Sequence, residues 1–179
     1  MPIPFRDHGD VDDLGLAGYL RFVDEGAGGL RGALFLVNGR GEPVEFCFSR
    51  VDVPASSLWR ASEARRQAVR ALCLPLFTAC PREPLLLLAR AEEVPPPVFA
   101  EDLEVLVPLC RVADGAAAAH AASEWAEELN DALHVFWVAA PPAPDSPVRV
   151  LLDALRGRGL MLEPFERAAR GIDEAFASM

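Results

Sequence analysis

The chain has 179 residues and a net charge of −10, and all 17 of its basic residues are arginines. A chain of this length can fold as one domain without disulfides or metals, and its negative charge opposes non-specific binding to nucleic acid or anionic membranes. Because lysine is absent, a Walker A phosphate loop, a Schiff-base enzyme and a kinase-type active site are excluded.

Three strands are predicted in the first third of the chain. Residues 16–25 and 30–37 are rich in β-formers, and Asn38-Gly39 after them is typical of a tight hairpin turn, since both residues tolerate positive φ. Residues 43–51 alternate apolar and polar side chains, with Glu45 on the polar face. The pattern predicts a three-stranded antiparallel meander with Glu45 on its solvated side.

A helix follows, with Ser56 or Ser57 as its cap and Pro75 as the residue that kinks or ends it. Residues 84–94 and 103–112 are predicted as short strands, separated by a proline elbow that exposes Phe99. Residues 116–133 are rich in alanine and predict a further helix, and residues 134–140 predict a strand. The whole is an α+β or α/β fold.

The domain organisation follows from the proline content. Residues 1–140 form the predicted core domain, residues 141–147 a proline-rich linker, and residues 148–179 a pair of helices packed on the core. No apolar run approaches the roughly 20 residues that span a bilayer, and the acidic start lacks the layout of a signal peptide. We therefore expect a cytoplasmic protein with no membrane partner.

The predicted order strand–strand–strand–helix–strand resembles that of the ribonuclease H-like nucleases. Those enzymes place acidic residues on the first strand, the first helix and the fourth strand, where they hold two divalent ions about 4 Å apart. The resemblance implies a divalent-metal-dependent nuclease as an alternative function. Asp24 falls at the end of its strand, and Glu63 lies among arginines on a face expected to be solvated. The implied catalytic carboxylates are Asp24, Glu63, and Glu92 or Glu93.

The leading hypothesis is a small non-enzymatic module for protein interaction or assembly. It follows from what the sequence lacks: no histidine cluster, no GxSxG elbow and no phosphate loop are present, so neither a cofactor nor a metal is expected. The partner is expected to be another protein with a basic or acidic patch, and the net charge argues against nucleic acid. The predicted partner-binding residues are Trp59, Arg60, Arg65, Arg66, Arg70 and Phe99.

A third hypothesis is a small-molecule-binding module that uses the β face near Glu45 and contains a deep apolar pocket. The four cysteines form no CxxC pair and are expected to be reduced residues of the core. An alternative for Glu45 is an ion pair with Arg21 in a polar patch on neighbouring strands that contacts a partner. The sequence leaves these alternatives open.

Four segments together resemble uncharacterised proteins of high-GC bacteria: "GALFLVNGRGEPVEFCFSRV", "LWRASEARRQAVRAL", "LLLARAEEVPPPVFAEDL" and "LEPFERA". In that family a turn followed by a "PxEF" element comes after a similar strand. The resemblance covers most of the chain and implies a bacterial, cytoplasmic origin. It implies no activity and no catalytic residue.

Overall fold

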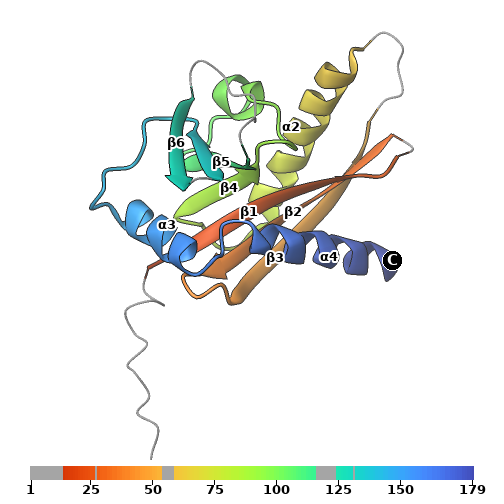
Figure 1. Cartoon of the computed structure of the whole chain (residues 1–179). Coiled ribbons are helices and arrows are strands. Elements are labelled where there is room, and N and C mark those ends of the chain that lie inside the picture. The colour runs from red at the N-terminus through yellow and green to blue at the C-terminus, as the bar shows by residue number, and fades with distance from the viewer. Residues whose placement is uncertain (1–13, 27, 54–58, 116–123, 131) are drawn as a thin grey trace, which may run out of the picture.

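The computed structural model describes residues 14–26, 28–53, 59–115, 124–130 and 132–179. These residues fold around a seven-stranded mixed sheet with the strand order β3-β2-β1-β4-β5-β7-β6 (Figure 1). The first three strands are β1 (Leu16–Asp24), β2 (Gly29–Asn38) and β3 (Pro43–Asp52), and they pair antiparallel in sequence order. The predicted meander is therefore confirmed.

The turn between β2 and β3 differs from the prediction. Positive φ occurs at Gly41 (82°), and no non-glycine residue within the described ranges adopts it. Asn38 acts through its side chain instead, because its Oδ1 accepts hydrogen bonds from the backbone N–H groups of Arg40 and Glu42, each at 3.0 Å. An Asx-type side-chain bond thus replaces the left-handed backbone that an Asn-Gly turn requires.

Parallel pairing begins where the chain returns to the other side of β1. Strand β4 (Leu86–Arg90) lies parallel to β1, and β5 (Leu109–Asp114) lies parallel to β4. Since β2 and β3 lie on one side of β1 and β4 on the other, the order of strands reverses between β1 and β4. In open sheets of this kind, ligands bind at the carboxyl ends of the strands beside such a reversal.

The far edge of the sheet corrects the prediction of an alanine-rich helix over residues 116–133. Residues 116–123 lie outside the described ranges, but Trp125–Asn130 form strand β6, which pairs antiparallel with β7 (Leu133–Trp137). Alanine, glutamate and leucine favour helices by propensity, yet pairing with a buried neighbouring strand overrides that preference.

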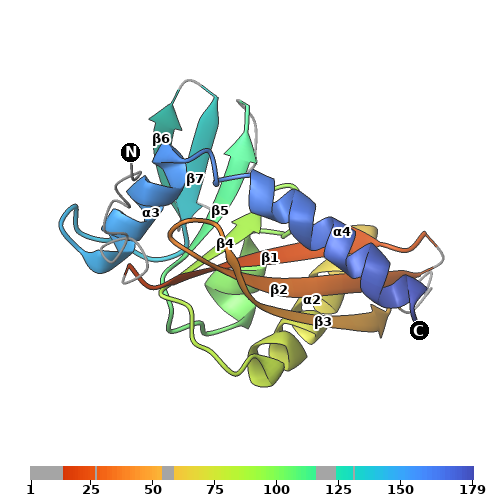
Figure 2. The ribbon, with the colours of Figure 1, turned by 90° about the horizontal axis from the view of Figure 1, so that it is seen from below.

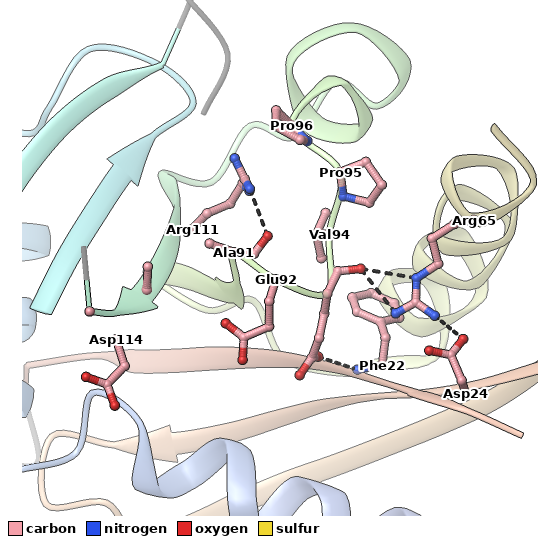
Figure 3. A pocket seen from close by; sticks show the side chains of 13 residues that line it. Phe22, Asp24, Arg65, Ala91, Glu92, Val94, Pro95, Pro96, Arg111 and Asp114 are labelled. Atoms are coloured by element: carbon pink, nitrogen blue, oxygen red, sulfur yellow. Dashed lines mark hydrogen bonds and ion pairs between the residues drawn. The ribbon is translucent and has the colours of Figure 1, made fainter. Parts of the chain in front are cut away.

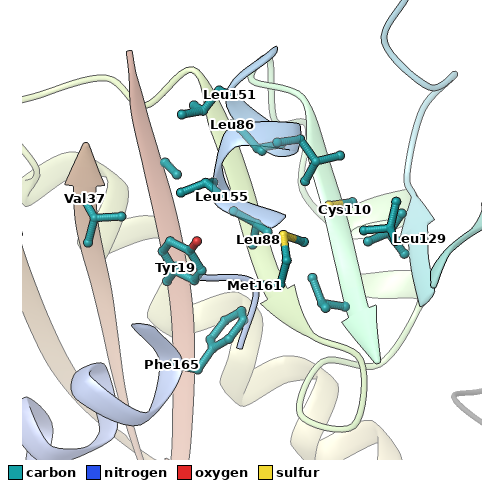
Figure 4. Close-up of a cluster of buried hydrophobic side chains, with 14 of the residues drawn as sticks. Tyr19, Val37, Leu86, Leu88, Cys110, Leu129, Leu151, Leu155, Met161 and Phe165 are labelled. Atoms are coloured by element: carbon teal, nitrogen blue, oxygen red, sulfur yellow. The ribbon is translucent and has the colours of Figure 1, made fainter. Parts of the chain in front are cut away.

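Helices cover both faces of the sheet (Figures 1 and 2). On one face, α2 (Ala61–Ala79) and the π-helical turn η1 (Val98–Asp102) share an apolar cluster with the sheet. On the other face, α3 (Pro147–Gly157) and α4 (Glu163–Ala177) do the same. Figure 4 shows this second cluster, in which Tyr19 packs edge-on against Phe165 with the ring centroids 5.0 Å apart.

Helix α2 continues through Pro75 to Ala79, so Pro75 does not end the helix. Proline removes the bond to the carbonyl four residues earlier, but Ala71 and Pro75 are both exposed and water can reach that carbonyl. The predicted caps Ser56 and Ser57 lie outside the described residues. Arg60 precedes the first turn of α2, and its side chain makes no capping hydrogen bond.

The predicted fold class is confirmed: an α+β arrangement in which a three-stranded antiparallel meander is followed by a helix and short strands, with two helices at the C-terminus. Within the described residues, no helix is both long and apolar enough to cross a membrane.

Candidate functional site

A cavity of 820 Å³ opens at the carboxyl ends of β1, β4 and β5, beside the reversal of strand order (Figure 3). The parallel pairing brings the ends of these three strands to one edge of the sheet. Apolar walls come from Phe22, Val94 and the Pro95-Pro96 segment. The ionisable side chains that line the cavity are Asp24, Glu92, Glu93, Asp114, Arg65 and Arg111.

Glu93 is the central ionised group and is only 8% exposed. Its carboxylate accepts a hydrogen bond from the Phe22 backbone N–H at 2.9 Å and pairs with the Arg21 guanidinium. Partial burial lowers the pKa of Arg21, and although Glu166 acts in the opposite direction, Arg90 lowers it further. Arg21 and Glu93 thus tie β1 to the segment after β4.

Arg65 reaches the cavity from the first turns of α2. Its Nε and Nη2 donate to the backbone carbonyl of Glu93 at 3.2 and 3.1 Å, and its Nη1 pairs with the Asp24 carboxylate (Figure 3). The Asp24 side chain is 72% exposed, whereas that of Arg65 is 21% exposed. The guanidinium is therefore fixed by a backbone carbonyl on one side and bound to a solvated carboxylate on the other.

The wall on the β5 side is built on a buried ion pair. Arg111 Nη1 donates to both carboxylate oxygens of Glu124, at 3.0 and 2.8 Å, and the two side chains are 1% and 0% exposed. Arg111 Nη2 donates to the Ala91 carbonyl at 2.9 Å. The signal for this pair in the sequence is a charged residue inside the apolar run of residues 107–113, which the motif-based reasoning above misses.

Of the four predicted metal-binding carboxylates, the structure brings three to the cavity. Asp24, Glu92 and Glu93 line it, whereas Glu63 does not and accepts a hydrogen bond from Gln67 at 3.3 Å. Glu92 pairs with Arg90, which lies over the Phe165 ring with its Cζ 5.9 Å from the centroid.

These carboxylates do not fit a two-metal centre of the kind that the ribonuclease H-like order implied. Asp24, Glu92 and Glu93 are each ion-paired with an arginine, so a divalent ion would have to displace a guanidinium from each of these three carboxylates. Asp114, at the end of β5, is the fourth carboxylate that lines the cavity. In the part of the chain that the structure describes, no three His, Cys, Asp or Glu side chains are grouped as metal ligands. The arrangement is one of alternating charges rather than a cluster of carboxylates.

The predicted arginine patch on α2 divides into separate environments. Arg65 belongs to the cavity, whereas Arg66 donates to Asp102 at 2.6 and 2.7 Å and to Glu101 at 2.9 Å. The hydrogen bond from Arg66 holds the pKa of Asp102 below its ordinary value. Arg60 and Arg70 are exposed, and Trp59 is 50% exposed. Phe99, which was predicted to be exposed, is 5% exposed and lies in the core beneath α2.

The histidines, Arg21, Glu45 and the cysteines are not among the described residues that line the cavity. His8 and His120 lie outside the described residues, and His134 is on β7 opposite Ala113. Arg21 pairs with Glu93 rather than with Glu45, which is partly exposed on β3. All four cysteines are free; Cys73 and Cys110 are buried, while Cys47 and Cys80 are half-buried.

Solved structures with a similar fold include three endonucleases. The catalytic domain of human endonuclease V is 15% identical, covers 93% of this chain and 84% of its own, and has a TM-score of 0.57. Endonuclease V of Ciona intestinalis, in complex with a DNA that contains an inosine followed by a ribo-adenosine, is 10% identical, covers 92% and 86%, and has a TM-score of 0.54. Endonuclease V of Bacillus subtilis is 11% identical, covers 90% and 80%, and has a TM-score of 0.52.

No protein-family model matches the chain, and no curated protein sequence matches it. At these identities the likeness shows the fold. The prediction of a non-enzymatic protein-interaction or assembly module is overturned by this likeness, because the similar structures are nucleases. The argument against a nucleic-acid partner is overturned as well, because the Ciona protein is bound to DNA. Both predictions relied on absent motifs and net charge, which do not report the shape of a site.

Proposed function

We propose that this protein acts on nucleic acid and holds a strand of it in the cavity at the carboxyl ends of β1, β4 and β5. The observation that carries the proposal is the position of this cavity, which lies at the reversal of strand order in a fold shared with endonucleases. Ligands of open sheets bind at this place. The cytoplasmic location predicted from the sequence stays part of the proposal.

The size and chemistry of the cavity support a polynucleotide ligand. A volume of 820 Å³ is at the upper end of small-molecule sites, and the mouth is lined by both ionised groups and proline and phenylalanine side chains. An arginine that is held in place can donate to a phosphate, and apolar walls can contact a base or sugar. Proteins that bind single-stranded nucleic acid typically combine contacts to the phosphates with contacts to the bases.

Fluorescence anisotropy with labelled 12-residue single strands of DNA and RNA, and with the duplexes, tests the proposal. Saturable binding is expected. The logarithm of the association constant should fall with the logarithm of the salt concentration, with a slope of about −0.7 for each phosphate contacted in a single strand. The same mixtures, incubated with Mg²⁺ or Mn²⁺ and run on a denaturing gel, show whether a bound strand is also cleaved.

The location is tested by a pair of charge reversals. Arg65→Glu should abolish binding, because Arg65 lines the cavity. Arg82→Glu is the matched control, since Arg82 is exposed and precedes β4, at the opposite edge of the sheet. Absence of saturable binding to every oligonucleotide, or equal losses in the two variants, would contradict the proposed function.

A further inference from the structure

Arg65 has the features of an anion donor that is oriented in advance. Two of its nitrogens, Nε and Nη2, donate to the Glu93 carbonyl, and this places Nη1 at the cavity (Figure 3). The carbonyl itself is fixed, because the Glu93 side chain is held by the Phe22 N–H and by Arg21. A guanidinium held in this way loses little rotamer freedom when it binds a ligand.

The present partner of Nη1 is the one member of the arrangement that can leave at low cost. Asp24 is the last residue of β1, and its side chain is 72% exposed. The Asp24 carboxylate is well solvated when alone, and an ion pair to such an exposed group contributes little to stability. A carboxylate oxygen and a phosphate oxygen also present the same acceptor to an arginine.

We infer that the cavity binds a nucleic-acid phosphate without a divalent cation, with the Arg65 guanidinium as donor and Asp24 as the carboxylate that the phosphate displaces. This inference rests on the proposed function and specifies its chemistry. In a two-metal site the carboxylates bind cations, and the cations bind the phosphate. Here arginines already pair with Asp24, Glu92 and Glu93, and the phosphate replaces one of those carboxylates in an existing ion pair.

The two arrangements predict opposite effects of removing the Asp24 charge. If Asp24 competes with the phosphate for Arg65, Asp24→Asn frees Nη1 and removes a repulsive charge, so affinity rises. We expect a gain of about two- to fivefold, as an exposed ion pair implies. If Asp24 instead binds a divalent cation that holds the phosphate, the same substitution lowers affinity.

Asp52→Asn is the matched control. Asp52 is also an exposed carboxylate at the end of a strand, 84% exposed and paired with Arg50 at 3.2 Å, but it does not line the cavity. It changes the net charge of the protein by the same amount, so it measures the general effect of charge on binding. We expect a change of less than about twofold, since an exposed charge that does not line the cavity acts on the phosphate only through solvent and salt.

The experiment measures the dissociation constant of a labelled single-stranded 12-mer for the wild type, Asp24→Asn, Asp52→Asn and Arg65→Gln, in EDTA and in Mg²⁺. The inference expects wild-type binding in EDTA that Mg²⁺ does not strengthen, tighter binding by Asp24→Asn only, and a loss of about tenfold or more in Arg65→Gln. Thermal melting checks that each variant folds, and Asp24→Asn alters only an exposed side chain.

Binding that requires Mg²⁺, or weaker binding by Asp24→Asn, would overturn the inference and leave the proposed function in place. A wild type that binds no oligonucleotide with or without Mg²⁺ would overturn the proposed function and the inference together. Tightening of equal size in Asp24→Asn and Asp52→Asn would show a general charge effect and would also overturn the inference.

Discussion

The buried Arg111–Glu124 pair forms one wall of the cavity, and its removal offers a quantitative test of the structure. Glu124→Gln keeps the shape of the side chain but leaves the Arg111 charge without its compensating carboxylate, in a position where both side chains are at most 1% exposed. Breaking a buried pair by removing one charge costs about 3–5 kcal/mol, because the remaining ion stays desolvated. The total free energy of unfolding of a domain is about 5–15 kcal/mol, so Glu124→Gln should lose a large part of the stability.

The hydrogen bond from Arg111 to the Ala91 carbonyl sets the expectation for a double substitution. Replacing the pair by Arg111→Met with Glu124→Leu removes both buried charges, which is often neutral or stabilising. It also removes the donor to the Ala91 carbonyl, at a cost of about 1–3 kcal/mol for an unsatisfied buried acceptor. The double variant should therefore be more stable than Glu124→Gln.

Urea unfolding, followed by circular dichroism and tryptophan fluorescence, measures these differences. Glu128→Gln is the matched control, because Glu128 is an exposed residue of the adjoining strand β6 and its substitution should change the unfolding free energy by at most about 0.5 kcal/mol. Equal stabilities of Glu124→Gln and Glu128→Gln would refute the claim that the pair is buried and that it supports the cavity wall.

Two further predictions concern the packing of the sheet and its response to acid. Gly18→Ala should destabilise the protein by about 1–3 kcal/mol, because the added Cβ would meet three leucine side chains at 2.7–3.0 Å. Gly157→Ala is the control and should not destabilise, because a Cβ there would have no atom within 4 Å. Thermal melting compares the two variants, and equal melting temperatures would contradict the packing around Gly18. The hydrogen bond from Arg149 lowers the pKa of Glu127 from its ordinary value of 4.5, so this carboxylate stabilises the fold above that value and the contribution is lost as pH falls through the lowered pKa. Glu127→Gln should therefore narrow the stability difference between pH 6 and pH 3 by about 1 kcal/mol or less, and an unchanged pH profile from urea unfolding would contradict it.

The sequence was sufficient for the strands of the meander and for the position of α2, since these depend on local alternation and helical periodicity. The sequence was insufficient where strand pairing or helix packing determines the local structure. The segment Trp125–Asn130 has helix-forming residues, and only its partner strand makes it extended. Pro75 is tolerated because of which face of α2 it occupies, and that face is known only once the helix is packed.

The sequence was sufficient to pick out the acidic residues of the candidate site. It did not indicate which arginine each of them pairs with. Glu92 and Glu93 are consecutive and project to different surroundings, so one is exposed and paired with Arg90 while the other is buried between Arg21 and the Phe22 N–H. The choice between them depends on the register of β1 with β4, where Leu20 lies opposite Ala89. No local pattern contains that register.

The net charge of −10 misled the prediction for a physical reason. Exposed charges farther apart than the Debye length, about 8–10 Å at physiological ionic strength, are largely screened from each other. A phosphate in the cavity would therefore interact chiefly with the groups that line it, where Arg65 is fixed and Asp24 is exchangeable. Net charge governs encounter and salt dependence over the whole surface, whereas the proposed binding at this site would depend on which ion pair at the end of β1 the phosphate can replace.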